Sequence, residues 1–342
     1  MKRIKIAQIG MNRYSHAPEI FHTMKIHPEV FELVGYALVE DERETCAEKI
    51  EKCFSGYTEL TLDEILNDES IELVAVETDE IHLLRYAQMA ADAGKHIHME
   101  KPGSQDLAAF EHLIETMRKS GKVFHTGYMY RYNPMIAKVI ERAKTGELGA
   151  IYSVEAHMSR HDDKEAREWF GSFKGGMMFY LGCHLIDLVL QIQGFPENII
   201  PLNTQTGIDD IYTDDLGFAV MQYKNGISVI RMGGAEIGGF RRRQLVVCGS
   251  KGTLEVRPLE ANIPEADSGK KYMMTAGLRE CDLGEDGHSR TTDIQSEPFQ
   301  RYEAMLVSFA EMVRGEKQNP YTLDYELELF RTIMKCCGIN DK

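Results

Sequence analysis

The first 126 residues alternate between short apolar runs and longer amphipathic segments, and this alternation constrains the fold more than any other feature. Each apolar run has the length of a strand, and the segments between them have helical spacing. Strands that alternate with helices in this way form a parallel, doubly wound sheet with right-handed crossovers. We therefore predict an α/β protein that begins with a Rossmann domain at residues 1–126. The expected strands are Ile4–Ile9, Phe31–Val39, Leu73–Glu77, the run ending at Lys101, and Lys122–Thr126.

The fourth expected strand ends at Glu100-Lys101-Pro102. Ligands of open α/β sheets bind in the crevice at the carboxyl ends of the strands, so Lys101 is expected at the rim of a binding site. Pro102 lacks an N–H and stops the strand there. A lysine in a cleft exchanges protons with a substrate hydroxyl when burial lowers its pKa. The alternative is a surface lysine after an ordinary strand.

The turn after the first strand carries part of a phosphate-binding pattern. A Rossmann turn has the pattern Gly-x-Gly-x-x-Gly, which lets backbone N–H groups approach a pyrophosphate. This chain keeps only the first glycine, and we assign cofactor contacts to Gly10, Met11, Asn12, Arg13 and Ser15, with His16 as a further cation. Asn12 tolerates a left-handed φ and Ser15 is small. A tight turn that binds nothing is an equally good interpretation.

An acid that binds the adenosine ribose is expected about 20 residues further on, at the end of the second strand. Leu38 occupies that place, and Glu40 and Asp41 follow it. A carboxylate from Glu40 at the ribose hydroxyls would favour NAD over NADP. A solvated acidic start to the next helix is the alternative. A short helix is expected to begin at the capping box formed by Thr61 and Glu64.

Residues 127–342 are expected to form a second, α+β domain for substrate binding and oligomerisation. Aromatic residues and one arginine are concentrated in Gly127–Pro134, where Tyr128 and Arg131 are candidates for gripping a sugar. If the apolar run 177–192 is helical, one face carries Tyr180, His184 and Asp187, a plausible acid/base array. The alternative is a structural pair of His184 with Asp187.

Beyond Gly194 the pattern changes to strands. Asn225-Gly226 and a second glycine-rich turn at Gly249 and Gly252 indicate hairpins of an open, largely antiparallel sheet. Such a sheet leaves one face available for self-association. Residues 262–297 are polar and predict a long loop, and two amphipathic helices near Tyr302–Val313 and Asp324–Cys336 are expected to close the chain.

Composition excludes several classes. A formal net charge of −15 repels polyanions, so nucleic acid is not an expected partner. No apolar run approaches the roughly 20 residues of a membrane helix, and no secretory h-region follows Met1. The seven scattered cysteines are not a disulfide framework, which indicates a reducing cytoplasm. No histidines and acids show metal-ligand spacing, so no metal is expected.

The whole chain resembles the Gfo/Idh/MocA family of NAD(P)-dependent oxidoreductases, which act mostly on sugars, inositols and related polyols. The matching segments are Glu100-Lys101-Pro102, Arg131-Tyr132-Asn133-Pro134, and Gly175-Gly176 through Gly182-x-His184-x-x-Asp187. The resemblance implies that Lys101 and His184 assist hydride transfer to or from a nicotinamide, that Glu100 lies near the cofactor, and that Trp169 joins the substrate contacts. It also implies NAD as cofactor, with NADP still open, and a homodimer or homotetramer formed through the second domain.

The sequence departs from the family pattern at two further places. The family's Thr-Pro-x-x-x-His is Thr78-Asp79-Glu80-Ile81-His82 here, so the proline is missing and His82 comes one place early; we still expect Thr78 and His82 at the cofactor. Tyr180 stands where many members carry an aspartate. The leading hypothesis is an NAD-linked oxidoreductase acting on a sugar or polyol, or a variant that uses transient oxidation for elimination. The alternative is a sugar- or nucleotide-sensing regulator without turnover.

Overall fold

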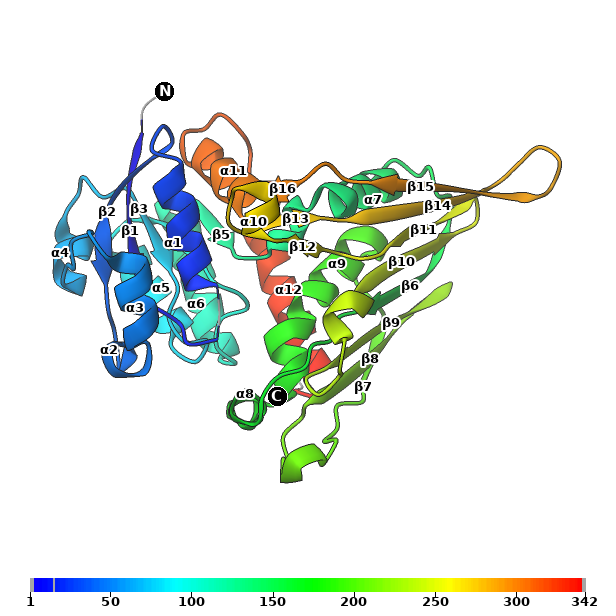
Figure 1. The fold of residues 1–342 in the computed structure, drawn as a ribbon, viewed down its shortest axis with the longest axis horizontal. Helices are drawn as coiled ribbons and strands as arrows, with labels where there is room; N and C mark the ends of the chain where they lie inside the picture. Colours follow the sequence, from blue (N-terminus) through cyan, green and yellow to red (C-terminus); the bar gives the residue numbers. More distant parts are fainter. Residues whose placement is uncertain (1–2, 15, 340–342) are drawn as a thin grey trace. The chain divides into compact units, whose positions relative to one another are not determined.

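The computed structural model describes residues 3–14 and 16–339, which fall into two compact units (Figure 1). The first unit contains the residues up to Tyr128 and also Tyr302–Phe330. The second contains Met129–Arg301 and the residues from Arg331 onward. The predicted division cuts the chain once, after residue 126, whereas here the segment Tyr302–Phe330 groups with the N-terminal residues. No helix among the described residues is long and apolar enough to cross a membrane.

The first unit is built on a five-stranded parallel sheet with the order β2-β1-β3-β4-β5. The predicted α/β fold class is therefore confirmed, since every neighbouring pair in this sheet is parallel. The second strand ends two residues before the predicted Val39. The strands are β1 (Ile4–Ile9), β2 (Phe31–Ala37), β3 (Leu73–Val76), β4 (His96–Met99) and β5 (Phe124–Thr126).

Helices follow the strands as the alternation predicts. The expected capping box is confirmed at α4, where Glu64 N–H donates to Thr61 Oγ1 (3.1 Å) and Thr61 N–H to Glu64 Oε2 (2.7 Å). The helix α1 packs against α3 and β2, and α5 packs against α6, β3 and β4. These helices are α1 (Ala17–Ile26), α2 (Glu42–Thr45), α3 (Ala47–Phe54), α4 (Leu62–Asn67), α5 (Leu83–Asp92) and α6 (Leu107–Ser120).

Two C-terminal helices, α11 (Glu303–Val313) and α12 (Leu323–Cys336), lie close to the predicted positions. The ring of Phe309 on α11 stacks on His125 of β5 with centroids 5.0 Å apart. The ring of Phe330 on α12 stacks on Phe110 of α6 at 4.1 Å. These contacts explain why Tyr302–Phe330 groups with the first unit.

The second unit contains an eight-stranded sheet with the order β15-β14-β11-β10-β6-β9-β8-β7. All neighbouring pairs are antiparallel except β6 and β9, which are parallel, so the predicted open, largely antiparallel sheet is confirmed. Its strands are β6 (Ile151–His157), β7 (Asn198–Pro201), β8 (Leu216–Tyr223), β9 (Gly226–Gly233), β10 (Gln244–Gly249), β11 (Gly252–Val256), β14 (Gly277–Leu283) and β15 (Ser289–Gln295).

Helices cover one face of this sheet. The helix α9 (Cys183–Gln193) packs against β6, β9 and α7 (Pro134–Lys144), and its residues from Cys183 to Ile192 are all buried. A π-helical turn, Met178–Gly182, leads into α9. The remaining helical segments are η1 (Met129–Tyr132), α8 (Lys164–Trp169), η2 (Phe170–Ser172), η4 (Ile208–Asp210), η5 (Gly239–Arg242) and α10 (Glu265–Ser268).

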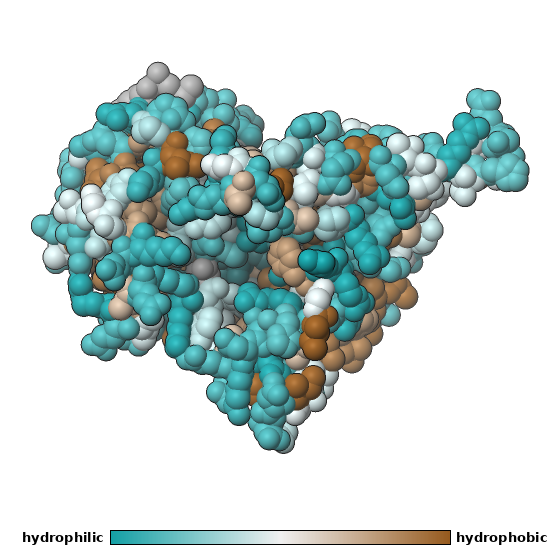
Figure 2. All heavy atoms as spheres, viewed as in Figure 1, coloured by the Kyte–Doolittle hydropathy of each residue, from teal (hydrophilic) through white to brown (hydrophobic). Residues whose placement is uncertain are grey.

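The predicted long loop at 262–297 is wrong, because this segment contains β14 and β15 and part of a small sheet of β12 (Ala261–Ile263), β13 (Met273–Thr275) and β16 (Phe299–Gln300). The hairpin β14–β15 projects from the rest of its unit (Figure 1), and its tip is hydrophilic (Figure 2). Both faces of a projecting hairpin meet solvent, so its residues lack the alternation of apolar and polar side chains by which strands are recognised.

The face of the large sheet opposite α9 carries a row of side chains that runs across all eight strands. Strand registers place these residues side by side, and none of them is fully buried. The half at β7, β8 and β9 is apolar, and the half at β11, β14 and β15 is charged. In sheet order from β7 the row is Ile200, Val220, Val229, Glu155, Val246, Glu255, Arg279 and Asp293.

Candidate active site

The candidate cofactor residues of the first unit follow the carboxyl ends of neighbouring parallel strands, where ligands of such sheets bind. Gly10 follows β1, Glu40 follows β2, Thr78 follows β3 and Lys101 follows β4. Gly10 has φ +95°, and a Cβ there would lie 2.6 Å from the backbone nitrogen of Thr78. Only glycine can therefore hold this close approach of the first turn to the third strand.

The turn after β1 is held from one side by two side chains. Cys46 Sγ donates to the carbonyl of Met11 (3.0 Å), and Lys49 Nζ donates to the carbonyls of Asn12 (3.2 Å) and Arg13. In a trans peptide the N–H points away from the preceding carbonyl. The N–H groups of Asn12 and Arg13 therefore point away from Cys46 and Lys49.

The Asn12 side chain is turned into the protein, where it is only 1% exposed. Its Nδ2 donates to the Thr78 carbonyl (3.0 Å) and to Glu80 Oε2 (2.9 Å), and its Oδ1 accepts from Tyr14 N–H (2.7 Å). Asn12 does not adopt a left-handed φ, although its tolerance of that conformation made it a candidate in the sequence. Among the described residues, the non-glycine residues with positive φ are Glu40, Asp209, Asp210 and Tyr272.

Glu40 lies in a polar group that includes His82, another candidate cofactor residue from the sequence. Its Oε1 accepts from Tyr86 Oη (2.6 Å) and Arg85 Nη1 (2.8 Å), and His82 Nδ1 lies 4.0 Å away. These partners, the Tyr86 hydroxyl first, hold the pKa of Glu40 below its usual value. Glu40 therefore presents a carboxylate at the end of β2.

Lys101 is buried beside three carboxyl groups. Its Nζ lies 3.5 Å from Glu100 Oε1, and its charge acts on Glu77 and Glu80 as well. Burial raises the pKa of Glu80 and of Glu100 to about 7 and that of Glu77 well above its usual value, although Lys101 opposes each shift. Sequence reasoning missed Glu77 and Glu80. Their only signal was the acidic run Glu77-Thr78-Asp79-Glu80 after a buried strand.

Glu77 also begins a buried chain of two histidines. His98 Nε2 lies 3.4 Å from Glu77 Oε1, and His98 Nδ1 lies 2.8 Å from His125 Nδ1. Burial lowers the pKa of His98 to about 4, which keeps its imidazole neutral.

In the second unit, Arg131 and Asp187, both candidate site residues from the sequence, form an ion pair whose side chains have no exposure to solvent. Arg131 Nε and Nη2 donate to the Asp187 carboxylate at 3.0 and 2.8 Å, and Gln191 Nε2 donates to the same carboxylate (2.8 Å). This pair joins η1 to α9 and so fixes the position of His184, one turn earlier on α9.

His184 is 3% exposed, and the ring of Tyr130 meets it edge-on with centroids 5.2 Å apart. Tyr130 Oη donates to Glu260 Oε1 (2.6 Å), and Arg243 Nη1 contacts both groups at 3.1 Å. Burial raises the pKa of Tyr130 to about 12, so its hydroxyl acts as a fixed donor.

Tyr180 lies on the π-helical turn, a feature often found at functional sites. Trp169, a candidate substrate contact from the sequence, meets the Tyr180 ring edge-on with ring centroids 5.2 Å apart. The ring centroid of Phe170 lies 5.6 Å from that of Tyr180. Arg160 hydrogen-bonds both Tyr180 and Asp162; although burial opposes its charge, these two groups raise the pKa of Arg160. No motif in the sequence pointed to Arg160 or Asp162.

Two predictions stand apart from these clusters. Ser15 lies outside the described residues. Tyr128 is buried in the first unit, at 2% exposure. Among the described residues no group of three or more His, Cys, Asp or Glu side chains could hold a metal ion.

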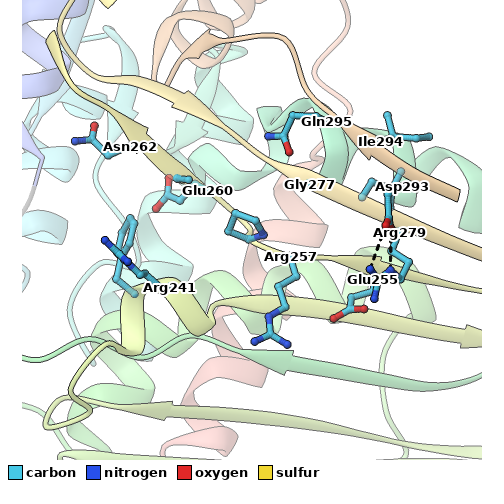
Figure 3. Close-up of a pocket in the computed structure, with 14 residues that line it drawn as sticks. Arg241, Glu255, Arg257, Glu260, Asn262, Gly277, Arg279, Asp293, Ile294 and Gln295 are labelled. Carbon is cyan, nitrogen blue, oxygen red and sulfur yellow. Dashed lines mark hydrogen bonds and ion pairs between the residues drawn. The ribbon is translucent and has the colours of Figure 1, made fainter. Parts of the chain in front are cut away.

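A cavity of about 1030 Å³ lies in the second unit and contains none of the predicted site residues (Figure 3). It is lined by charged side chains of β11, β14 and β15, among them Glu255, Arg279 and Asp293 of the row described above. Arg279 Nε donates to Asp293 Oδ1 at 2.8 Å. The cavity therefore lies on the face of the large sheet opposite α9, which we call the helix-free face.

The fold and the edge of its first sheet define a class, the oxidoreductases with an NAD-binding Rossmann fold. Residues 4–128 match the family model described as oxidoreductase family, NAD-binding Rossmann fold, and residues 136–255 match the Gfo/Idh/MocA C-terminal domain. The chain belongs to the Gfo/Idh/MocA family of oxidoreductases, as the resemblance predicted.

Individual relatives are distant. The uncharacterized oxidoreductase YhhX of Escherichia coli is 29% identical over 138 residues, and the match spans 40% of this chain and 40% of YhhX. The D-glucoside 3-dehydrogenase of E. coli is 26% identical over 142 residues, which is 39% of this chain and 40% of that enzyme. A structure from Desulfitobacterium hafniense, assigned as an NADPH-dependent oxidoreductase, has the same fold, with a TM-score of 0.79 at 17% identity over 98% of this chain and 95% of its own.

The residues of the first unit fit a dinucleotide. Gly10 allows the close approach of the turn to β3, the Asn12 side chain is directed inward, and the N–H groups of Asn12 and Arg13 point away from Lys49. Glu40 supplies a carboxylate where a ribose hydroxyl is bound in this fold. Gly10, Asn12, Arg13 and Glu40 are therefore the residues that would hold the nucleotide.

Proposed function

We propose that this protein oxidises or reduces a carbinol carbon of a sugar, inositol or related polyol, with Lys101 and His184 handling the proton. The observation that carries the proposal is the environment of Lys101, an ammonium group buried among Glu77, Glu80 and Glu100 at the end of β4. Perturbed titratable groups that cluster at the ligand-binding edge of a sheet mark functional sites.

Each residue has a distinct role in the proposal. Lys101 exchanges a proton with the substrate hydroxyl, because its ammonium is a compact donor that the nearby carboxyls hold in place. The imidazole of His184 orients the hydroxyl or shares its proton, and Tyr180 contacts it. The buried Arg131–Asp187 pair positions α9 instead of touching substrate. A bound nicotinamide supplies the hydride acceptor or donor.

We propose NAD as the preferred cofactor. The Glu40 carboxylate would hydrogen-bond ribose hydroxyls and repel the 2′-phosphate of NADP. Its contact with Arg85 lessens this repulsion, and therefore the preference is expected to be moderate. The substrate class rests on the residue pattern of the family and on the similarity to a D-glucoside 3-dehydrogenase.

The test is a titration with NADH and NADPH, followed by nicotinamide fluorescence, and then a screen of sugars, inositols and glycosides for formation of reduced nicotinamide. Binding with turnover on one of these classes supports the proposal. Binding of both nucleotide and sugar without turnover would favour the alternative, a sensing protein. Failure to bind either nucleotide at any pH would overturn the proposed oxidoreductase and would leave only a sugar-sensing protein as the alternative.

We further propose that the protein forms a homodimer or homotetramer through the helix-free face of its large sheet. The apolar half of the row on this face includes Ile200, which is 39% exposed, and Ile227, two residues before Val229 of the row on β9, is 52% exposed. Figure 2 shows hydrophobic side chains gathered on this flank of the second unit, below the projecting hairpin. Sedimentation of the protein and of a Val229→Lys variant tests this: only the variant should sediment as a monomer.

The compartment is part of the same proposal. None of the seven cysteines, all of which lie in the described part of the chain, forms a disulfide, and four of them are buried. Reduced cysteines in this number suit a reducing compartment, and we assign the protein to the cytoplasm. Formation of disulfides in protein purified without reductant would contradict this assignment.

A further inference from the structure

The Asn12 side chain makes three hydrogen bonds, two of which join the turn after β1 to the loop after β3. Its Nδ2 faces two oxygens, the Thr78 carbonyl and Glu80 Oε2, and its Oδ1 faces the N–H of Tyr14. An amide placed between acceptors on one side and a donor on the other has only one favourable orientation. Glu80 therefore fixes the side chain that shapes the turn.

Glu80 is an unusual partner for this turn. Its side chain has no exposure to solvent, and its second oxygen, Oε1, is buried without a hydrogen bond from the described part of the chain. An ionised carboxylate in such a place has one oxygen neither solvated nor paired, which is costly. A proton on Oε1 removes that charge and leaves Oε2 as the acceptor for Asn12.

Building on the proposed function, we infer that Glu80, acting through Asn12, is the positioning residue of the dinucleotide turn, and that the turn accepts a diphosphate only when the Glu80 carboxyl is neutral. An ionised Glu80 places a negative charge directly behind the turn, where a diphosphate brings at least one more. Like charges in a poorly solvated site repel strongly. Glutamate at this place thus makes phosphate binding depend on a proton.

The charges around Glu80 allow its carboxyl to gain or lose a proton near neutral pH. Lys101 is the cation that acts on it, whereas Asp79 and Glu100 add negative charge. Burial prevails and brings the pKa of Glu80 to about 7. The other ionisable side chains in the turn and on elements packed around it include Arg13, Tyr14, His16, Glu19, Glu42, Cys46, Lys49 and Glu77.

The sign of the linkage follows. A bound diphosphate favours the neutral carboxyl, so binding takes up a proton whenever the free protein has Glu80 ionised. The affinity for NADH is then constant below about pH 7 and falls above it, by up to about tenfold for each pH unit. A cofactor turn without a titrating carboxyl shows no such decline.

The experiment compares the wild type with Glu80→Gln between pH 6 and 9, with NADH binding followed by fluorescence and proton uptake by calorimetry in two buffers of different ionisation enthalpy. Glutamine retains the oxygen that accepts from Asn12 and cannot ionise. We expect the wild type to lose about tenfold or more in affinity between pH 7 and 9, and Glu80→Gln to lose none and take up no proton.

Two further variants separate positioning from charge. Asp79→Asn removes a carboxylate of the same loop that accepts from Ile81 N–H, not from Asn12. Because the charge of Asp79 raises the pKa of Glu80, this variant should keep the decline in NADH affinity but begin it at a lower pH than the wild type. Glu80→Ala removes the partner of Asn12 and should bind NADH weakly at every pH, whereas Glu80→Gln rescues binding. Thermal unfolding of each variant without nucleotide verifies that it is folded.

The outcomes are distinguishable. If the wild type and Glu80→Gln bind NADH with the same pH dependence, the inference is overturned and the proposed function stands. If Glu80→Ala binds as well as Glu80→Gln, Glu80 does not position the turn. If no variant binds NADH or NADPH at any pH, the inference falls together with the proposed function.

Discussion

Arg131 and Asp187 face each other as a bidentate ion pair that no solvent reaches, and this pair ties η1 to the helix that carries His184. Removing one partner of a buried pair leaves an uncompensated charge, which destabilises a protein by about 3–5 kcal/mol. We expect Asp187→Asn to lower the free energy of unfolding by an amount in this range, measured by urea denaturation.

A surface pair is the matched control. Arg118 and Asp324 form an ion pair whose side chains are 47% and 77% exposed. Arg118→Gln should change the free energy of unfolding by about 0.5 kcal/mol or less. Equal effects of Asp187→Asn and Arg118→Gln would contradict a structural role for the buried pair.

The buried carboxyls make stability depend on pH. The pKa of Glu80 and that of Glu100 are about 7 in the folded protein, against an ordinary value of 4.5. The folded state therefore holds these protons more firmly than the unfolded chain, and stability falls as pH rises from about 4.5 to 7. Each group contributes on the order of 3 kcal/mol to this loss.

Denaturation of Glu80→Gln at pH 5 and pH 8 measures how much Glu80 contributes to the pH dependence of the free energy of unfolding. We expect the variant to gain about 2 kcal/mol relative to the wild type between these two pH values. Glu69→Gln, which alters an exposed carboxylate with an ordinary environment, should gain nothing. A constant difference between Glu80→Gln and the wild type across pH would refute the assigned pKa direction.

The choice between cofactors tests Glu40. Glu40→Gln removes the carboxylate that we propose binds the ribose and leaves Arg85 and His82 to attract a 2′-phosphate. We expect the ratio of the NADPH to the NADH dissociation constant to fall about tenfold, equal to about 1.4 kcal/mol. Glu32→Gln, at the opposite end of β2, is the control, and an unchanged ratio in Glu40→Gln would remove Glu40 from the ribose site.

Turnover tests the two residues that we propose handle the proton. Lys101→Met and His184→Asn should each lower kcat by about 10²–10⁴, the range of general acid–base catalysis, while NADH binding by Lys101→Met changes far less. Lys122→Met, on a half-buried lysine that is not near the carboxyl cluster, should retain the wild-type rate. A Lys101→Met enzyme with near wild-type kcat would exclude the lysine from the mechanism.

The capping box of α4 gives a prediction that is independent of function. Thr61→Ala removes the hydroxyl that accepts from Glu64 N–H and should destabilise the protein by about 1 kcal/mol. Thr61→Ser keeps that hydroxyl and should stay within a few tenths of the wild type. Thermal unfolding measures both variants, and equal melting temperatures for all three proteins would count against the cap.

The sequence predicted an element correctly where at least one of its faces is buried. The alternation of β1 to β5 with helices predicted a parallel sheet, since burial on both faces requires continuous apolar runs such as Leu73–Val76. The cap at Thr61 was predictable because its hydrogen bonds are local. The strands β14 and β15 were missed, because a hairpin exposed on both faces carries no apolar alternation.

The chemistry of the candidate site was only partly predictable. Lys101 and His184 stood out through their motifs, whereas Glu77, at the end of an expected strand, and Glu80, in the loop after it, belong to no motif. Their burial follows from how the β1 and β3 ends meet, which local sequence does not encode. The partner of Asn12 lies 68 residues away, and that contact exists only in the folded sheet.

The stacking of Phe309 on His125 and of Phe330 on Phe110 has a consequence for biosynthesis. A nascent chain that has emerged only as far as β5 lacks the two aromatic rings that stack on β5 and on α6. The nucleotide-binding fold therefore matures late, after nearly the whole polypeptide has been translated, and the N-terminal portion needs shielding from aggregation until then.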